Sequence, residues 1–68
     1  MKLNVAYSGP AITTYQGQMI DKDTPITGAF YIDREDEHKV VLCSGQHNDQ
    51  YEYYVARSNF EGRAVVYH

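Results

Sequence analysis

The chain has 68 residues, with nine acidic residues, six basic residues and a net charge of −3 at neutral pH. Because nucleic-acid affinity comes mostly from clustered lysines and arginines, and the six bases are scattered along the chain, direct binding of DNA or RNA is disfavoured. A single cysteine, Cys43, excludes an intrachain disulfide, and with it the class of small disulfide-stabilised secreted domains.

Six short segments rich in β-branched and aromatic residues, each ended by a turn signal, predict strands. No window has the 3.6-residue period of an amphipathic helix. We therefore expect an all-β, mainly antiparallel fold: a small five- or six-stranded curved meander or partly open barrel, in one domain over residues 1–68, with consecutive strands as neighbours. The predicted strands are Lys2 to Ser8, Thr13 to Ile20, Ile26 to Asp33, His38 to Ser44, Tyr51 to Ser58 and Arg63 to Tyr67.

The first two segments differ in polarity. Alternation of Leu3, Val5 and Tyr7 with polar or small residues is typical of a half-buried antiparallel strand. The second segment is mostly polar, which predicts an edge strand, and Gly17 within it suggests a bulge. It is followed at residues 21–25 by a turn, in which aspartate side chains bond the backbone two residues further on.

The next two segments predict the centre of the sheet. One face of the third strand is apolar, and a charged connection of four or five residues then leads to a run of consecutive apolar residues in the fourth. Such a run predicts burial on both faces of a strand or at a barrel corner. A turn over residues 59–62 leads into the last strand. The apolar face consists of Ile26, Gly28, Phe30 and Ile32, and the apolar run is Val40, Val41, Leu42 and Cys43.

Tyrosines of the third and fifth strands supply the first candidate binding site. Tyr53 and Tyr54 point to opposite faces, because side chains alternate along a strand. Tyr53 belongs with Val55 in the better core set, so Tyr54 is placed on the outer face together with Tyr31. We expect these two rings to form an exposed aromatic patch that binds a partner or a planar ligand; the alternative is that a homodimer covers this face.

Three acidic residues in the predicted hairpin connection, Glu35, Asp36 and Glu37, supply a second candidate site. Carboxylates at this position can dock against a basic surface of a protein partner. The alternative is a solvated hairpin tip whose charge prevents aggregation between sheet edges.

A catalytic or metal site is less well supported. Cys43, His47 and Asp49 are close enough in sequence to suggest a thiol nucleophile with a base and an orienting carboxylate. A cysteine that follows apolar strand residues is more often a small buried hydrophobe, and His47 is typical of a polar loop. We therefore expect no enzyme activity, no metal and no cofactor. The metal ligands considered lack the paired spacing of zinc or calcium sites, and they are His38, His47, His68, Cys43, Asp21 and Asp23.

Size and composition favour a non-enzymatic binding protein that covers a surface of a protein partner, like the inhibitors and accessory proteins that phages and mobile elements carry. The alternative is an oligomeric protein that holds a small planar molecule, such as a nucleotide, between tyrosines. Because so small a core is thin, we expect a homodimer or larger symmetric assembly. No segment approaches the ~18 apolar residues of a membrane span and the N-terminal residues alternate in polarity, so we expect a cytoplasmic protein without membrane contact.

Overall fold

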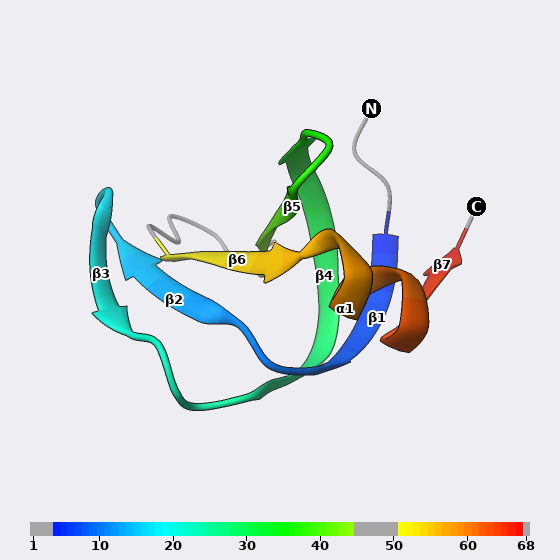
Figure 1. Cartoon of the computed structure of the whole chain (residues 1–68), viewed down its shortest axis with the longest axis horizontal. Coiled ribbons are helices and arrows are strands. Elements are labelled where there is room, and N and C mark those ends of the chain that lie inside the picture. The colour runs from blue at the N-terminus through cyan, green and yellow to red at the C-terminus, as the bar shows by residue number, and fades with distance from the viewer. Residues whose placement is uncertain (1–3, 45–50, 68) are drawn as a thin grey trace.

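The computed structural model describes residues 4–44 and 51–67, which form one curled sheet and a short helix (Figure 1). The strand order is β3-β2-β6-β5-β4-β1-β7, and all neighbouring pairs are antiparallel. The predicted all-β, mainly antiparallel class is confirmed, and the sheet is not closed into a barrel. The elements are β1 (Asn4–Gly9), β2 (Ile12–Tyr15), β3 (Gln18–Asp21), β4 (Ile26–Glu35), β5 (Lys39–Cys43), β6 (Tyr51–Ala56), α1 (Arg57–Arg63) and β7 (Ala64–Tyr67).

Two short connections do not place consecutive strands side by side, contrary to the expectation from connection length. Only Pro10 and Ala11 separate β1 from β2, yet β1 pairs with β4 and β7, whereas β2 pairs with β3 and β6. The chain crosses here from one half of the sheet to the other, and the connection from β3 to β4 crosses back along the same side (Figure 1). The two crossings curl the sheet and place β1 next to the last strand.

The second predicted strand is a hairpin and not a single bulged strand. Gln16 and Gly17 have φ values of 52° and 83°. Two consecutive residues with positive φ form the two-residue turn whose twist suits a hairpin, and glycine adopts this conformation without steric cost. Gly17 is therefore part of the turn. The irregularity falls instead between Thr13 and Thr14, where pairing with β3 shifts by one residue. The prediction of an edge strand is confirmed for β3.

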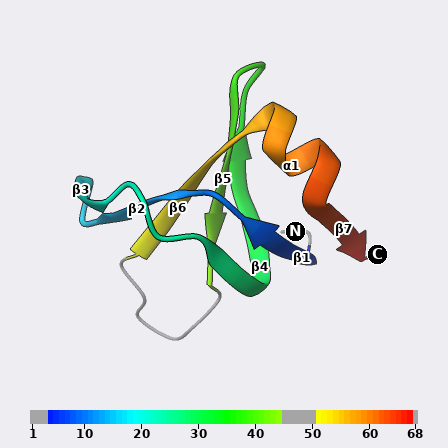
Figure 2. The same cartoon turned by 60° about the horizontal axis from the view of Figure 1, so that its bottom comes forward.

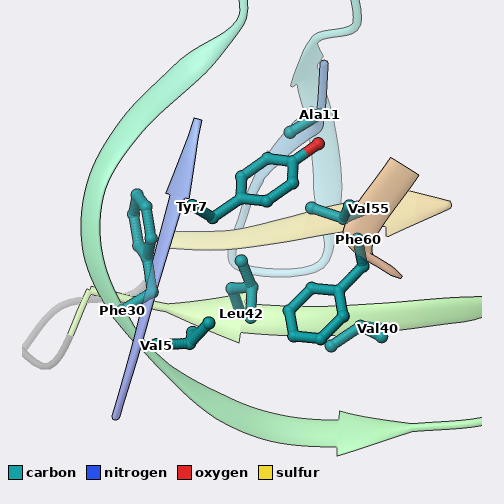
Figure 3. Close-up of a cluster of buried hydrophobic side chains, with 8 residues drawn as sticks. All are labelled: Val5, Tyr7, Ala11, Phe30, Val40, Leu42, Val55 and Phe60. Carbon is teal, nitrogen blue, oxygen red and sulfur yellow. The ribbon is translucent and has the colours of Figure 1, made fainter. Parts of the chain in front are cut away.

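The core lies inside the curl and combines β1, β4, β5, β6 and α1 (Figure 3). The predicted apolar face of β4 is confirmed, since Phe30 is buried there and Ile26 and Ile32 pack against the same cluster. Burial of the fourth segment on both faces is confirmed for Val40, Val41 and Leu42, which are at most 1% exposed, whereas Cys43 is half-buried. The buried cluster consists of Val5, Tyr7, Ala11, Phe30, Val40, Leu42, Val55 and Phe60.

A seven-residue helix, α1, replaces the turn that was predicted at residues 59–62. It follows β6 directly and inserts Phe60 into the core, where the ring stacks on Tyr7 with centroids 6.3 Å apart (Figure 3). At its start, the backbone N–H of Arg57 donates to the carbonyl of His38 at 2.9 Å, which ties the helix to the β4–β5 hairpin. A helix of two turns is too short to show a clear 3.6-residue period, so the sequence pattern missed it.

Phe60→Ala should strongly destabilise the fold, because truncating a buried aromatic ring removes its contacts and leaves a cavity. We expect the free energy of unfolding to fall by about 3–5 kcal/mol, measured by urea denaturation followed by circular dichroism. Glu61→Ala changes an exposed residue of the same helix and should alter this free energy by less than about 0.5 kcal/mol. Similar small effects of both substitutions would contradict the role of α1 as a cover for the core.

Candidate functional site

The predicted faces of the tyrosines are confirmed. Tyr53 lies on the core side, where its ring meets Phe30 edge-on with centroids 5.4 Å apart. Tyr54 lies on the opposite face, paired across β5 with Val41, and Tyr31 of β4 shares this outer face through its pairing with Cys43. Both outer tyrosines are half-buried and not fully exposed. Because β5 separates them, Tyr31 and Tyr54 do not form one continuous aromatic patch.

Tyr54 is held in place by two basic side chains. The Arg34 guanidinium donates a weak hydrogen bond to the Tyr54 hydroxyl at 3.4 Å. The Lys39 ammonium lies 5.8 Å from the centre of the ring, within the range of a cation–π interaction. Beneath them, Val41 is only 1% exposed although it faces away from the main core. Tyr54 thus acts partly as a cover for the outer face of β5.

Arg34 connects β4 to β6 through carboxylates. Its guanidinium makes a bidentate contact with Glu52, at 3.0 and 3.3 Å, and a second contact with Asp33 at 2.6 Å. Hydrogen bonds to Glu52 and Asp33 raise the pKa of Arg34 above its ordinary value. Because the positive charge is already matched by two carboxylates, Arg34 positions Tyr54 without offering an unneutralised charge to a partner.

A hollow of about 180 Å³ opens beside the Tyr54 ring, and we name it the Tyr54 hollow. Ile12 and Tyr54 are cross-strand partners and form an apolar side of it, and Ile12 is 38% exposed. Lys22 approaches from the connection between β3 and β4, and its side chain is exposed. The hollow therefore combines an aromatic wall with one cation. Its lining residues are Pro10, Ala11, Ile12, Lys22, Tyr54, Ala56 and Asn59.

A second, shallower hollow of about 290 Å³ lies over β1, β4 and β7, and we name it the Gly28 hollow. The hydroxyls of Ser8 and Thr27, two of its lining residues, are 3.0 Å apart and bond to each other. Val65, which also lines it, is 59% exposed. The Gly28 hollow has no aromatic wall open to a ligand, since the only aromatic lining residue in the described part of the chain is Tyr7, at 2% exposure.

The acidic candidate site is largely engaged within its own hairpin. The Asp36 carboxylate accepts the backbone N–H groups of His38 and Lys39, at 2.7 and 2.9 Å, and pairs with the Lys39 ammonium at 3.1 Å. Backbone hydrogen bonds from His38 and Lys39 lower the pKa of Asp36 to about 2. Glu35 pairs with Arg57 at 3.3 Å. Of the three acids, Glu37 extends furthest into solvent, with its side chain 87% exposed.

Arg57 joins this hairpin to the start of α1. Its Nε donates to the carbonyl of Asp36 at 2.8 Å, and its Nη2 donates to the same carbonyl and to the Glu35 carboxylate. With the backbone bond to His38, one arginine contacts three positions of the β4–β5 hairpin. The hairpin tip is therefore a structural joint, and Glu35 and Asp36 shape it. Neither the predicted docking site nor its alternative, a solvated tip whose charge prevents aggregation, included this role.

The catalytic and metal candidates are not brought together in the described part of the chain. His47, Asp49 and His68 lie outside the described residues. Cys43 is half-buried at the end of β5. No group of three or more His, Cys, Asp or Glu residues that could hold a metal ion occurs among residues 4–44 and 51–67. No described helix has the length and apolar character needed to cross a bilayer.

The turn predicted at residues 21–25 is confirmed. The Asp21 carboxylate accepts the backbone N–H groups of Asp23 and Thr24, at 2.8 and 2.9 Å, and the Thr24 hydroxyl at 2.7 Å. These bonds, of which the one from the Thr24 hydroxyl is the strongest influence, lower the pKa of Asp21. Both oxygens of Asp21 are used by the turn, as expected for a residue that builds a loop.

Sequence reasoning missed a group of exposed apolar side chains at the β3 end of the sheet, which we name the apolar arm: Tyr15, Met19, Ile20 and Tyr51. Met19 and Ile20 are 60% and 56% exposed, and the Tyr15 and Tyr51 rings touch with centroids 4.7 Å apart. The hairpin that carries three of these residues projects on the side opposite to α1 (Figure 2). The sequence contained one signal for this group, namely the two adjacent apolar residues Met19 and Ile20 in an otherwise polar segment.

Comparison with known proteins identified no matching family model, no matching curated protein and no matching solved structure. The surfaces of the molecule therefore supply the basis for a functional proposal.

Asp36 should make the fold sensitive to acid. Its pKa is about 2 in the fold and near 3.8 when unperturbed, so its charged form stabilises the fold above about pH 4, and this contribution is lost as the pH falls through 2. Asp36→Asn keeps an acceptor oxygen but cannot titrate. The melting temperatures of wild type and variant should differ most near neutral pH and converge between about pH 4 and pH 2.

The matched control is Glu37→Gln, which alters a side chain that is 87% exposed. Its melting temperature should follow that of the wild type across the whole pH range. A constant difference between wild type and Asp36→Asn at all pH values would show that the carboxylate charge does not stabilise the hairpin.

Proposed function

We propose that the chain is a non-enzymatic binding protein that covers a surface of a protein partner, with the Tyr54 hollow receiving one side chain of that partner. The observation that carries the proposal is the small size of the hollow together with its aromatic wall. Pockets for drug-sized ligands have volumes of about 300–1,000 Å³. At about 180 Å³, the Tyr54 hollow suits a single protruding side chain better than a nucleotide.

Tyr54 has the properties of an interface anchor. Tyrosine is enriched at the centres of protein interfaces, where an apolar ring and a polar tip are both satisfied. Arg34 and Lys39 already contact this ring in the free chain, through a weak hydrogen bond and a cation–π interaction, and restrict its motion. A side chain that is already ordered loses less conformational entropy on binding, which favours affinity. The neighbouring Ile12, 38% exposed, extends the apolar contact beyond the hollow.

The charges around the hollow indicate the kind of side chain that would enter it. Arg34 and Lys39 are matched by Glu52, Asp33 and Asp36. Lys22 makes no ion pair within residues 4–44 and 51–67, so its charge is available. The side chain that best matches the hollow therefore has an apolar body, which packs on the Tyr54 ring, and a carboxylate or another acceptor at its end, which pairs with Lys22.

The acidic tip offers a second, separate contact to a basic region of the same partner. Since Glu35 and Asp36 are engaged with Arg57 and Lys39, the interaction would depend mainly on Glu37. Surface charges of this kind increase the rate of association more than they increase the final affinity. We therefore place the acidic tip at the rim of the interface and Tyr54 at its centre.

One observation favours the alternative function, in which a small planar molecule is held between tyrosines. Tyr15 and Tyr51 are 38% and 40% exposed and their rings lie in contact, so a planar molecule could stack on the exposed aromatic surface of Tyr15. Mass spectrometry of protein purified under native conditions distinguishes the two functions. A co-purified nucleotide or other planar ligand would support the alternative, whereas bare protein would favour the binding of a protein partner.

Tyr54→Ala should weaken partner binding by on the order of thirtyfold, because truncation of a central aromatic anchor costs about 2 kcal/mol or more. The partner is first isolated from the native host with immobilised wild-type protein and identified, and the affinities of purified variants are then measured by calorimetry. Val65→Ala, at a residue that is 59% exposed and distant from the hollow, is the control and should bind like the wild type.

Because Tyr54 also covers Val41, a second variant separates binding from stability. Ile12→Ser removes apolar surface at the edge of the hollow and should also weaken binding while leaving the circular dichroism spectrum intact. Tyr53→Ala, on the core side, should lower stability more than Tyr54→Ala. If folded Tyr54→Ala and Ile12→Ser proteins both bind with wild-type affinity, the Tyr54 hollow is not the contact.

A further inference from the structure

We propose that two copies of the chain associate by antiparallel pairing of their β3 strands, so that the two sheets join into one continuous sheet with a two-fold axis at Met19. This inference concerns a surface that the proposed function does not use, since the Tyr54 hollow lies beside the start of β2 and the β3 edge lies at the end of the sheet.

The backbone of β3 is open on its outer side. In the strand order β3 is terminal and pairs with β2 alone within the described residues. Tyr15 and Gln18 close the two-residue turn, and a pair in this position exchanges both backbone hydrogen bonds. Because hydrogen-bonding direction alternates along a strand, the N–H and C=O of the next residue, Met19, point away from β2. These groups are available to a second strand.

The side chains at this edge do not protect it from pairing. Natural edge strands are usually protected by lysine, proline or inward-pointing charges. The segment from Gln18 to Ile20 has none of these residues, and Met19 and Ile20 are 60% and 56% exposed. The irregularity opposite Thr13 begins only after Met19. Backbone pairing is thus limited to about three residues of each copy, and side-chain burial must supply the remaining stability.

Charge selects the register. A two-fold axis at Met19 places Met19 opposite Met19 of the second copy, and Gln18 opposite Ile20, so that every directly paired position is uncharged. An axis two residues further along would place Asp21 opposite its own copy, and like charges in that arrangement are destabilising. Pairing about the axis at Met19 also keeps the corresponding faces of the two sheets on the same side. Each copy then contributes the same surface to the contact, as an isologous interface requires.

The apolar arm indicates that the molecule that pairs with the free edge of β3 is a second copy of the chain. Tyr51 and Tyr15 of the arm form a row of side chains that reaches the β3 edge at Gln18, because Tyr15 pairs with both Gln18 and Tyr51. Met19 pairs with Thr14 and lies on the opposite face. In the proposed dimer this row continues into Ile20 of the second copy, and the same contact is repeated by symmetry. At the opposite edge, β7, Val65 is 59% exposed, which makes it the position for the matched control substitution.

The test measures mass in solution and then the register. Analytical ultracentrifugation of the wild-type chain at micromolar concentration should give twice the mass of a single chain. Met19→Lys, which adds a protecting charge at an exposed position, should give the single-chain mass with an unchanged circular dichroism spectrum. Val65→Lys, the matched change at the other edge, should remain dimeric.

Cysteine cross-linking in a Cys43→Ala background then locates the axis. Residues directly opposite each other in a hydrogen-bonded antiparallel pair have Cα atoms about 5.5 Å apart, which is within the range of a disulfide. Met19→Cys should therefore form a covalent dimer on mild oxidation. Gln18→Cys should not, because Gln18 faces Ile20 of the second copy and its own copy lies beyond reach.

Three outcomes would overturn the proposal: a wild-type chain that stays monomeric, a dimer abolished by Val65→Lys and not by Met19→Lys, or cross-linking of Gln18→Cys with no cross-linking of Met19→Cys. A fourth outcome, polymers larger than a dimer that both lysine substitutions dissolve, would also overturn it, because it would show that β3 pairs with β7 of the next copy. None of these measurements requires the protein partner, so failure here leaves the role of the Tyr54 hollow open to its own test.

Discussion

Burial of β5 on both faces is the constraint on which the other parts of the structure depend. Val40 and Leu42 face the main core and Val41 faces the other way, and all three are almost completely enclosed. A chain of this size has too few apolar residues for two full layers. The first face is covered by the curl of the sheet and by Phe60 of α1. The second is covered by Tyr54 with its basic neighbours, so the same ring both stabilises the fold and forms the hollow.

Two arginines couple the hairpins to the rest of the sheet through geometry more than through charge. Arg34 links β4 to β6, and Arg57 links the β4–β5 hairpin to α1. Exposed ion pairs contribute little by themselves. Two other contacts differ from such ion pairs because they involve backbone groups. Arg57 donates to the Asp36 carbonyl, and the Asp36 carboxylate accepts a backbone N–H of its own turn, so these hydrogen bonds fix the backbone direction at the hairpin tip. The side chains of the proposed interface are thereby presented by a rigid frame.

Period-2 alternation correctly predicted the properties that depend on nearest neighbours along a strand. It placed Tyr53 inside and Tyr54 outside, and the consecutive apolar residues from Val40 to Leu42 indicated their burial on both faces. Features that depend on distant parts of the chain were not predictable in this way. The strands on either side of the crossing at Pro10, β1 and β2, pair with strands distant in the sequence, and α1 is held by Phe60 in the core. Tyr54 contacts Arg34 and Lys39, which no local pattern brings together.

The position of β1 between β4 and β7 affects how the chain folds. Val5 pairs with Phe30 on one side and with Val66 on the other, so residues near opposite ends of the chain must meet before the sheet is complete. The pairing of β2 with β6 spans a similarly long loop, and Thr14 bonds to the carbonyl of Glu52 across 38 positions. Contacts so distant in sequence slow folding, because loop closure must precede the favourable pairing. During synthesis β1 therefore emerges before β7 and keeps an unpaired edge until β7 is available.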